Sequence, residues 1–549
     1  MLLFYVFLPP LLFIFLRAYG LIKNYQNARK FGLPIILLPV SFEDSWWMPL
    51  RPLFAWVEHL PWGLGSWYVY TEMGWPTIDG NRTTARLGEN FVLCSPSSNQ
   101  IITCYRAGLK SSFGQHKNWM LPKAQSQLFA FYGQNVSSTN GTDWQRHRKI
   151  TAAAFNEDMM ERVWHESTNR AGSFDRVGER NFTLGSLRSE LEIIAMQVLA
   201  VVGFGQDRSL TSIPSGHKES LLECLNAVLK HLILTLVFSG LKAPNFLLPR
   251  ILRRLKVSVA ELRLYMEESV LYQMRQSSST DSKSQSPSLL EAMVKANEVE
   301  KQESLKKTAR ASYLTDSELY GNLFVFNIAG FETTASSMTF ALPFLAAYRD
   351  VQDWIIEEVD RHYTASSDRS YATAYPKLVR CLACLYETLR VASPAPLLIR
   401  EPTVAQTLPI ITPHGESSII VNPGTLVGGH LYGAHLSSRW GHDAETFNPK
   451  RFILVASNGD ETLVLPDNVS FLPWMIGSRI CPGKKFSQVE FVGVMARVLS
   501  NFCLRPEQSN GESEEEARAR LLATLAQKYF NISAHLRQPE SASVRFERR

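Results

Sequence analysis

The sequence predicts a mainly α-helical protein with small β-sheets, an α+β fold built as one large helical domain. Long apolar or amphipathic runs at residues 191–204, 221–238 and 315–342 have the length and spacing of helices. Shorter alternating stretches that contain turn residues, at 77–95 and 417–427, predict strands. The chain has 549 residues, of which 45% are hydrophobic and 20% charged, and this composition is that of a globular protein.

The first segment of the chain, residues 1–22, is apolar and is followed by basic side chains. It is long enough to cross a bilayer only if it continues past Arg17, whose side chain can extend to the interface. A cleaved signal peptide would need a basic start and a small-residue cleavage site, and neither is evident. Basic residues after an apolar segment hold the following domain in the cytosol. We therefore expect a single-pass membrane anchor at 1–22 and a basic, proline-containing linker at 23–44.

The rest of the chain divides into a main domain at 45–540 and a basic tail at 541–549 that we expect to be disordered. The main domain begins with a tryptophan-rich stretch, residues 46–75, which fits either a membrane interface or ordinary core packing. The net charge of +6 is too mild to indicate a nucleic-acid-binding protein. Seven cysteines without a paired framework suit a reducing compartment. Cys381 and Cys384 lie in an apolar helical run, which argues against zinc ligands.

Cys481 stands just before a predicted helix, because apolar residues recur at helical spacing from Lys484 onward. A thiol at a helix N-terminus faces unpaired N–H groups and the positive end of the helix dipole. We therefore expect a lowered pKa and a thiolate, the form that binds metals. Gly477 and Gly483 let the backbone pass close to a flat or bulky group, and Arg479 could pair with a negatively charged group. A lone cysteine more often packs as a small hydrophobe, so the rest of the pattern must decide.

The run at 315–342 predicts a long helix that Thr315 and Glu318 open as a capping box. It is apolar almost all round, which indicates a helix through the core. Glu332 and Thr333 in its middle are costly there unless they are solvated, paired or functional. Gly330 lowers helix stability by about 1 kcal/mol relative to alanine and opens space beside the helix.

Two further pairs of residues have helical spacing. Trp144 and Arg148 lie four residues apart and share one helix face, where the arginine can pair with a carboxylate. Taken alone, this pair also fits a surface arginine over a packed tryptophan. Glu387 and Arg390 follow an apolar run, and a charge pair on a buried helix needs further partners.

Glu358 and Arg361 have the same spacing as Glu387 and Arg390. They lie on a helix with a polar face, and we expect an ordinary solvated pair that contributes a few tenths of a kcal/mol. The spacing alone therefore does not mark a functional site.

Taken together, these segments resemble the cytochrome P450 family of haem-thiolate monooxygenases. Residues 471–486 are similar to the haem-binding signature of that family, and residues 329–333 to its oxygen-activation motif. The motifs follow one another in the order found in the family, and the sequence of residues 440–452 is typical of its fungal and other eukaryotic members. Trp474 replaces the usual phenylalanine of the signature, and Leu436 stands where many relatives have arginine.

The resemblance implies the cytochrome P450 fold and haem b (iron protoporphyrin IX) as the cofactor. It makes Cys481 the axial ligand of the haem iron, and Glu332 and Thr333 the catalytic pair that delivers protons and holds oxygen. The structural triad that it implies consists of Glu387, Arg390 and Arg451. The residues that it assigns to haem binding are Trp144, Arg148, Arg400, Trp474, Gly477, Arg479 and Gly483.

The resemblance also implies an enzyme that inserts one oxygen atom from O2 into a lipophilic small molecule. Electrons would come from NADPH through a separate NADPH–cytochrome P450 reductase, with cytochrome b5 as a second candidate partner. The protein would be located at the endoplasmic reticulum membrane, with its catalytic domain in the cytosol. The cations that we expect on the reductase-facing side, or on a plain solvated face, are Arg146, Lys149, Arg479, Lys484 and Lys485.

The similarity of residues 440–452 to fungal members favours an enzyme of secondary-metabolite biosynthesis, with a terpenoid, polyketide or alkaloid as substrate. One alternative is a redox-neutral haem-thiolate isomerase or dehydratase, which would not need the pair Glu332 and Thr333. Another is a haem sensor or carrier without turnover. Oxygen-dependent NADPH consumption that the substrate stimulates would exclude a passive binder.

Overall fold

The fold is described from a computed structural model of the chain. The structure describes residues 2–175, 181–184, 186–205, 212–232, 234–235, 244, 248–277, 287–306, 312–364, 366–467 and 469–549. The chain divides into two compact units. The prediction of one large domain at residues 45–540 stays a prediction. The first unit contains Met1–Gln125, Ala395–Glu445 and Asp467–Ile480. The second unit contains Ser126–Pro394, Thr446–Pro466 and Cys481–Arg549.

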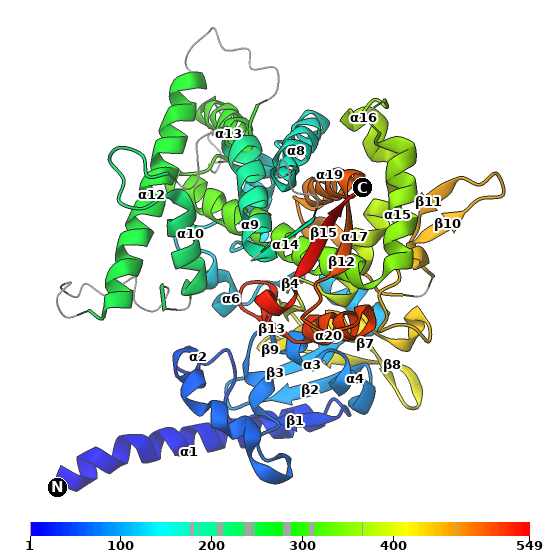
Figure 1. Ribbon diagram of the computed structural model, residues 1–549. Coiled ribbons are helices and arrows are strands. Elements are labelled where there is room, and N and C mark those ends of the chain that lie inside the picture. The colour runs from blue at the N-terminus through cyan, green and yellow to red at the C-terminus, as the bar shows by residue number, and fades with distance from the viewer. Residues whose placement is uncertain are drawn as a thin grey trace. The chain divides into compact units, whose positions relative to one another are not determined.

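The first unit combines a β-sheet with short helices (Figure 1). Its strands are β1 (Ile35–Leu37), β2 (Asn90–Cys94), β3 (Asn99–Thr103), β4 (Trp119–Met120), β6 (Leu397–Pro402), β7 (Gln406–Thr412), β8 (Gly415–Val421) and β9 (Thr425–His430). Its helices are α1 (Leu2–Arg29), α2 (Trp47–Leu50), α3 (Trp75–Asp79), α4 (Arg82–Leu87), α5 (Arg106–Gly114) and α18 (Leu431–His435). Six strands form a mixed sheet in the order β1-β2-β3-β9-β6-β4, and β7 and β8 form a separate hairpin.

The middle of this sheet is buried on both faces. Every residue of β2 and β3 is buried. Successive residues of β2 join different apolar clusters, since Val92 packs with Ile101 on one face and Phe91 with Ile102 on the other. A strand of this kind reads as an apolar run, not as an alternation. The predicted strand region at 77–95 therefore contains only one strand, β2, and its earlier residues form α3 and α4.

Helix α1 and strand β1 belong to the first unit and do not form the predicted linker at residues 23–44. Ala28 is fully buried in the apolar cluster of β2 and β3, and β1 pairs in parallel with β2. Arg17 donates to the two carboxylate oxygens of Asp44 at 2.7 and 2.6 Å instead of extending along an apolar helix. The segment is ordered because these contacts satisfy its charges and its backbone groups.

The predicted membrane anchor at residues 1–22 is not supported. Within the part of the chain that the structure describes, we find no helix with both the length and the apolar character needed to cross a membrane. Helix α1 also contains Pro9 and Pro10.

The second unit is mainly helical (Figure 1). Its helices are α7 (Gly141–Ala152), α8 (Glu157–Arg170), α9 (Leu187–Val198), α10 (Leu221–Lys230), α12 (Arg250–Ser277), α13 (Leu289–Lys306), α14 (Asp316–Ala347), α15 (Arg349–His362), α16 (Tyr371–Ala374), α17 (Val379–Val391), α19 (Lys484–Asn501) and α20 (Glu514–Ala526). Its strands are β5 (Asn181–Thr183), β10 (Ile453–Val455), β11 (Glu461–Leu463), β12 (Phe502–Pro506), β13 (Lys528–Phe530), β14 (Ala534–Leu536) and β15 (Val544–Arg548). Helix α6 (Lys123–Leu128) lies where the chain passes from the first unit to the second.

Helix α14 is the central element of the second unit. The predicted capping box is present, since Thr315 and Glu318 exchange hydrogen bonds between side chain and backbone at its start. The helix packs against α9, α17, α20 and β12. This burial explains why its sequence is apolar almost all round.

The predicted disordered tail, residues 541–549, contains strand β15. It pairs with β12 and β5 in an antiparallel sheet. Phe546 is fully buried and stacks on Phe182 with a ring-centroid distance of 5.0 Å. Alternate residues, Val544 and Phe546, face the core, and this apolar face orders a segment whose other residues are mostly charged.

Candidate active site

Cys481 lies at the start of α19, as predicted. The helix begins at Lys484 with Gly483 as its N-cap, and the Gly483 N–H donates to the cysteine sulfur. The residue as a whole is exposed to solvent, but many protein atoms surround its sulfur. Burial of the sulfur by these atoms raises the pKa of the thiol and outweighs the opposing effects of the Gly483 N–H and the Arg148 charge. The expected lowering of the pKa by the helix N-terminus is therefore wrong for the metal-free protein, because burial is the larger effect.

The residues before Cys481 in the signature belong to the first unit. Met475 and Gly477 have left-handed backbone angles, with φ of 64° and 70°. At Gly477 a Cβ atom would stand 2.3 Å from the Gly114 carbonyl oxygen, so only glycine fits there. Trp474 packs edge-to-face with Phe471 at 6.4 Å. A left-handed methionine is uncommon, and such conformations gather at functional sites.

The predicted pair on α7 is present in the second unit. Trp144 is buried, and Arg148 is half-buried. Burial lowers the pKa of Arg148, while the Cys481 thiolate raises it, which places the two charges close enough to interact. Among the described residues, Arg148 has no carboxylate partner.

Arg400 and Arg479 are neighbouring cations in the first unit. Arg400 on β6 is 4% exposed, donates to the Ile399 carbonyl at 2.8 Å and contacts no carboxylate of the described chain. Burial, followed by the charge of Arg479, lowers the pKa of Arg400 to about 9. Burial also lowers the pKa of Arg479 to about 10. These cations would gain from an acidic ligand.

The described residues fit a haem. The thiol of Cys481 is a suitable iron ligand, and Arg148 and Arg400 both have guanidinium groups without a carboxylate partner in the described part of the chain. Haem propionates are carboxylates, so they would supply the missing negative charge. The assignment of individual residues to the haem stays a prediction.

The middle of α14 has one open face. From Gly321 to Ala347, all residues of the helix are buried except Ala329, Gly330 and Thr333. These three share one side of the helix because their spacing is one turn. The Thr333 hydroxyl donates to the Ala329 carbonyl at 2.7 Å.

Gly330 also brings two elements close together. A Cβ atom there would lie 3.1 Å from both methyl carbons of Leu199, in the π-helical turn Leu199–Gly203. The glycine thus allows close packing of this turn against α14, in addition to the open face that the sequence predicts.

Glu332 points away from this open face into a polar cluster. Its Oε1 lies 3.0 Å from His535 Nε2 and 3.8 Å from Arg188 Nη2, and it accepts a hydrogen bond from the Ser533 hydroxyl at 3.1 Å. Burial alone would raise the pKa of Glu332. The hydrogen bond and charge of His535, with Arg188 and Ser533, outweigh it and lower the pKa.

The sequence did not predict the partners of Glu332. Ser533 and His535 lie about 200 residues later, in the turn and second strand of the β13–β14 hairpin, and Arg188 is on α9. No local pattern marks them, although a buried acid on α14 predicted that some partner existed.

Glu387, Arg390 and Arg451 come together as predicted. Arg390 donates to the two oxygens of Glu387 at 2.6 and 2.7 Å, and Arg451 donates to Oε1 at 3.2 Å. The Asn448 N–H and the Thr446 carbonyl complete the network. Glu387 and Arg390 are fully buried, and this saturation explains how the core tolerates them.

The expected solvated pair of Glu358 and Arg361 does not form. Glu358 is buried and accepts the N–H groups of Arg380 and Cys381 at 2.7 and 3.0 Å, so it caps the first turn of α17. Burial raises the pKa of Glu358 to about 7. Arg361 instead pairs with Glu357 at 2.7 Å on the surface.

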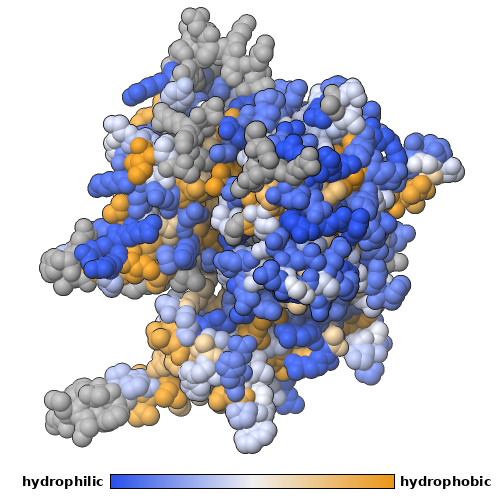
Figure 2. Space-filling model, in the orientation of Figure 1, coloured by the Kyte–Doolittle hydropathy of each residue, from blue (hydrophilic) through white to orange (hydrophobic). Residues whose placement is uncertain are grey.

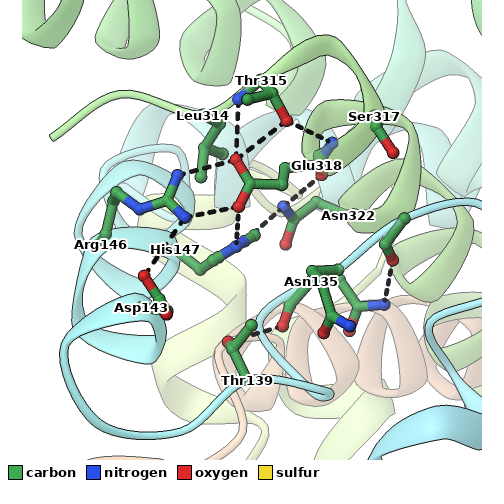
Figure 3. A network of polar contacts seen from close by, with 12 residues as sticks. Asn135, Thr139, Asp143, Arg146, His147, Leu314, Thr315, Ser317, Glu318 and Asn322 are labelled. Atoms are coloured by element: carbon green, nitrogen blue, oxygen red, sulfur yellow. Dashed lines mark hydrogen bonds and ion pairs between the residues drawn. The ribbon is translucent and has the colours of Figure 1, made fainter. Parts of the chain in front are cut away.

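Part of the predicted reductase-facing cation set is used inside the second unit. Arg146 donates to both oxygens of Glu318 at 2.8 and 2.5 Å and joins α7 to the start of α14 (Figure 3). His147 is fully buried, and its Nε2 lies 3.4 Å from the same carboxylate. Lys149 pairs with Glu300. Arg146 therefore has a carboxylate partner within the second unit, while the Lys149 side chain is 66% exposed. The reductase-facing role of these cations stays a prediction.

Comparison with known proteins identifies the family of this chain. The sequence profile of the cytochrome P450 family matches residues 100–531. The chain is similar to "Cytochrome P450 monooxygenase 124" of Postia placenta, with 31% identity over 73% of this chain and 75% of that protein. It is also similar to "Cytochrome P450 monooxygenase ORF6" of Penicillium roqueforti, with 26% identity over 90% and 89% of the two chains.

A third relative and one solved structure extend the comparison. The "Phomenoic acid biosynthesis cluster cytochrome P450 monooxygenase" of Leptosphaeria maculans is 26% identical over 94% of each chain. A crystal structure of a cytochrome P450, CYP102L1, superposes with a TM-score of 0.62 at 19% identity, over 86% of this chain and 94% of that one. This chain belongs to the cytochrome P450 family, as a monooxygenase of the fungal type.

Proposed function

We propose that this monooxygenase binds haem b through Cys481 and inserts one oxygen atom from O2 into a lipophilic small molecule of secondary metabolism. The observation that carries the proposal is the Cys481 thiol at the start of α19, near the partly buried and carboxylate-free Arg148. One relative is named for a phomenoic acid biosynthesis cluster, which supports the secondary-metabolite part of the proposal.

The haem-binding residues have separate tasks in this proposal. Cys481 would hold the iron, and bound haem would supply the activation of oxygen. Arg148, Arg400 and Arg479 would pair with the propionates, and Trp144 would pack beside them. The left-handed Gly477 and the N-cap Gly483 would shape the loop on either side of the cysteine, and Trp474 would take the aromatic position of the signature.

The open face of α14 is the proposed place of the reaction. Thr333 would hold water or oxygen there with its hydroxyl, and Glu332 would deliver protons from the polar cluster behind it. A redox-neutral isomerase would not need this acid and hydroxyl pair, so their presence favours the monooxygenase over the alternative. The triad of Glu387, Arg390 and Arg451 would keep the core in shape and would not touch the substrate.

We also propose a membrane-surface location, with electrons from NADPH through a separate reductase. Large apolar side chains are exposed along α1, and further ones follow α2 (Figure 2). Those that are more than half exposed include Leu11, Ile14, Phe15, Leu53, Trp56 and Trp62. Such residues favour the membrane interface. Flotation of the purified protein with phosphatidylcholine vesicles would test the location, and a protein that stays entirely in the lower fraction would contradict it.

Spin-state titrations and turnover assays test the enzymatic proposal. A panel of terpenoid, polyketide and alkaloid compounds is titrated into the haem-loaded protein, and binders are assayed with NADPH and an added reductase. We expect at least one lipophilic compound to shift the spin state and to gain one oxygen atom from O2, detected with isotopically labelled O2. Binding without any oxygen-dependent NADPH consumption would support the sensor or carrier instead.

A further inference from the structure

The carboxylate of Glu332 is held by three side chains from two other elements of the second unit. Arg188 reaches it from α9, and Ser533 and His535 reach it from the β13–β14 hairpin. Glu332 is 6% exposed, His535 is 4% exposed and Ser533 is fully buried. A carboxylate at this depth needs such partners to stay ionised.

The contacts are unequally divided between the two carboxylate oxygens. Within the part of the chain that the structure describes, every hydrogen bond and ion pair to Glu332 falls on Oε1. Oε2 keeps no protein partner there. The cluster therefore fixes the carboxylate by one oxygen and leaves the other available to exchange a proton.

A small cavity lies against this cluster. It is lined by Arg188, Glu192, Glu332 and His535, among others, and has room for about one water molecule. Arg188 pairs with Glu192 at 2.5 Å, and both side chains are partly exposed. Polar partners line the cavity on several sides, which is what an ordered water needs. The cavity thus offers a place for one ordered water beside Glu332.

The titratable and charged groups around Glu332 come from three elements. Arg188 and Glu192 come from α9, His535 from β14, and Tyr529, which interacts with Arg188, from β13. The Tyr529 ring lies 5.4 Å from the His535 ring. Among these groups, His535 makes the closest contact with Glu332.

We propose that His535 is a positioning residue that holds Glu332 by Oε1, so that Oε2 stays available to exchange protons with a water in the cavity. This inference rests on the proposed monooxygenase function. In each cycle the ionised carboxylate accepts a proton on Oε2 from the cavity water and passes it on, and the water regains a proton from bulk solvent. The carboxylate and the water thus both end in their starting states. His535 does not touch the substrate.

The direct test compares His535→Ala, His535→Gln and the wild type in the fraction of consumed NADPH that appears as product. We expect His535→Ala to lower this coupling about 10-fold. The amide of His535→Gln can still donate to Oε1, so it should restore most of the coupling. Wild-type coupling in His535→Ala would overturn the proposal.

A matched control separates this role from ordinary stability. His217 also contacts buried and partly buried acids, with Nδ1 3.0 Å from Glu261 and Nε2 3.2 Å from Glu268, and its side chain is 1% exposed. It lies in the loop before α10 and contacts α12, and no contact in the described part of the chain links it to Glu332. We expect His217→Gln to change the melting temperature but not the coupling. An equal loss of coupling in His217→Gln would contradict a specific role for His535.

A double-mutant cycle on the haem-free protein gives a readout that does not depend on turnover. We expect His535→Gln and Glu332→Gln to be non-additive in the melting temperature, because the two side chains are in direct contact. Additive effects would overturn the inferred contact. If the wild type formed no haem-thiolate complex, the proposed function would fail while this cycle still decided the contact.

Discussion

Two groups of buried charges in this protein differ in how far the chain itself satisfies them. In the triad, Glu387 receives hydrogen bonds from Arg390, Arg451 and a backbone N–H, so opposite charges meet within one network. Arg148 and Arg400 are at least half-buried but contact no carboxylate of the described chain. The difference indicates that the triad stabilises the fold by itself. We expect the two arginines to be stabilised only when they bind an acidic ligand.

The largest effect should come from breaking the saturated network. Glu387→Ala leaves Arg390 buried without its carboxylate, and we expect a loss of about 3–5 kcal/mol in the free energy of unfolding. Arg361→Ala is the control, because it removes a surface ion pair, more than half exposed on both sides, that contributes less than about 1 kcal/mol. Urea unfolding of the haem-free proteins measures both. Similar losses in the two variants would show that the triad is no more structural than a surface pair.

The carboxylate-free arginines should behave in the opposite way. Arg400→Met and Arg148→Met each remove a charged hydrogen-bond donor to the ligand, and we expect haem affinity to fall by about 10- to 150-fold, which corresponds to about 1.5–3 kcal/mol. The stability of the haem-free protein should not fall, because an unpaired buried cation is costly. Haem titration and unfolding of the same samples check both statements.

Arg263→Met is the control for these two variants, since Arg263 is exposed on α12 and pairs with Glu267 at 2.8 Å. We expect unchanged haem affinity there. Unchanged affinity in Arg400→Met and Arg148→Met as well would remove the distinction between the two groups of charges.

A third case is the partly buried ion pair of Glu318 and Arg146, whose contribution to stability depends on pH. Burial would raise the pKa of Glu318, but the hydrogen bonds from Arg146 and the Thr315 backbone outweigh it and lower the pKa to about 2 (Figure 3). A carboxyl group whose pKa is depressed on folding adds stability above its unfolded pKa, near 4.5, and loses it as the pH falls toward 2.

The corresponding variant is Glu318→Gln, which removes the titrating group. We expect the stability difference between the wild type and Glu318→Gln to be constant above about pH 5 and to shrink as the pH falls from about 4.5 toward 2. Thermal unfolding across this range measures it. A difference that stays constant down to pH 2 would show that Glu318 has an ordinary pKa in the folded protein.

The sequence predicted the elements whose signals are local. The capping box of α14, the pair of Trp144 and Arg148 on α7, and Cys481 before α19 all depend on residues within a few positions of one another. The meeting of Arg451 with Glu387 was available only through the family resemblance, because 64 residues separate them.

The incorrect predictions share a physical cause, which is that tertiary contacts override local composition. Residues 541–549 are basic, yet Phe546 is buried and orders them as a strand. The partners of Glu332, which the sequence did not predict, lie in a hairpin near the end of the chain, and no spacing rule connects Glu332 to His535.

The proposed haem-thiolate function depends most on Cys481 as the iron ligand. The direct measurement is the carbon-monoxide difference spectrum of the reduced, haem-loaded protein, recorded for the wild type, Cys481→Ala and the control Cys503→Ala, which changes a partly exposed cysteine at the other end of α19. We predict the haem-thiolate spectrum for the wild type and for Cys503→Ala, and its loss in Cys481→Ala. The same spectrum in the wild type and in Cys481→Ala would contradict the account.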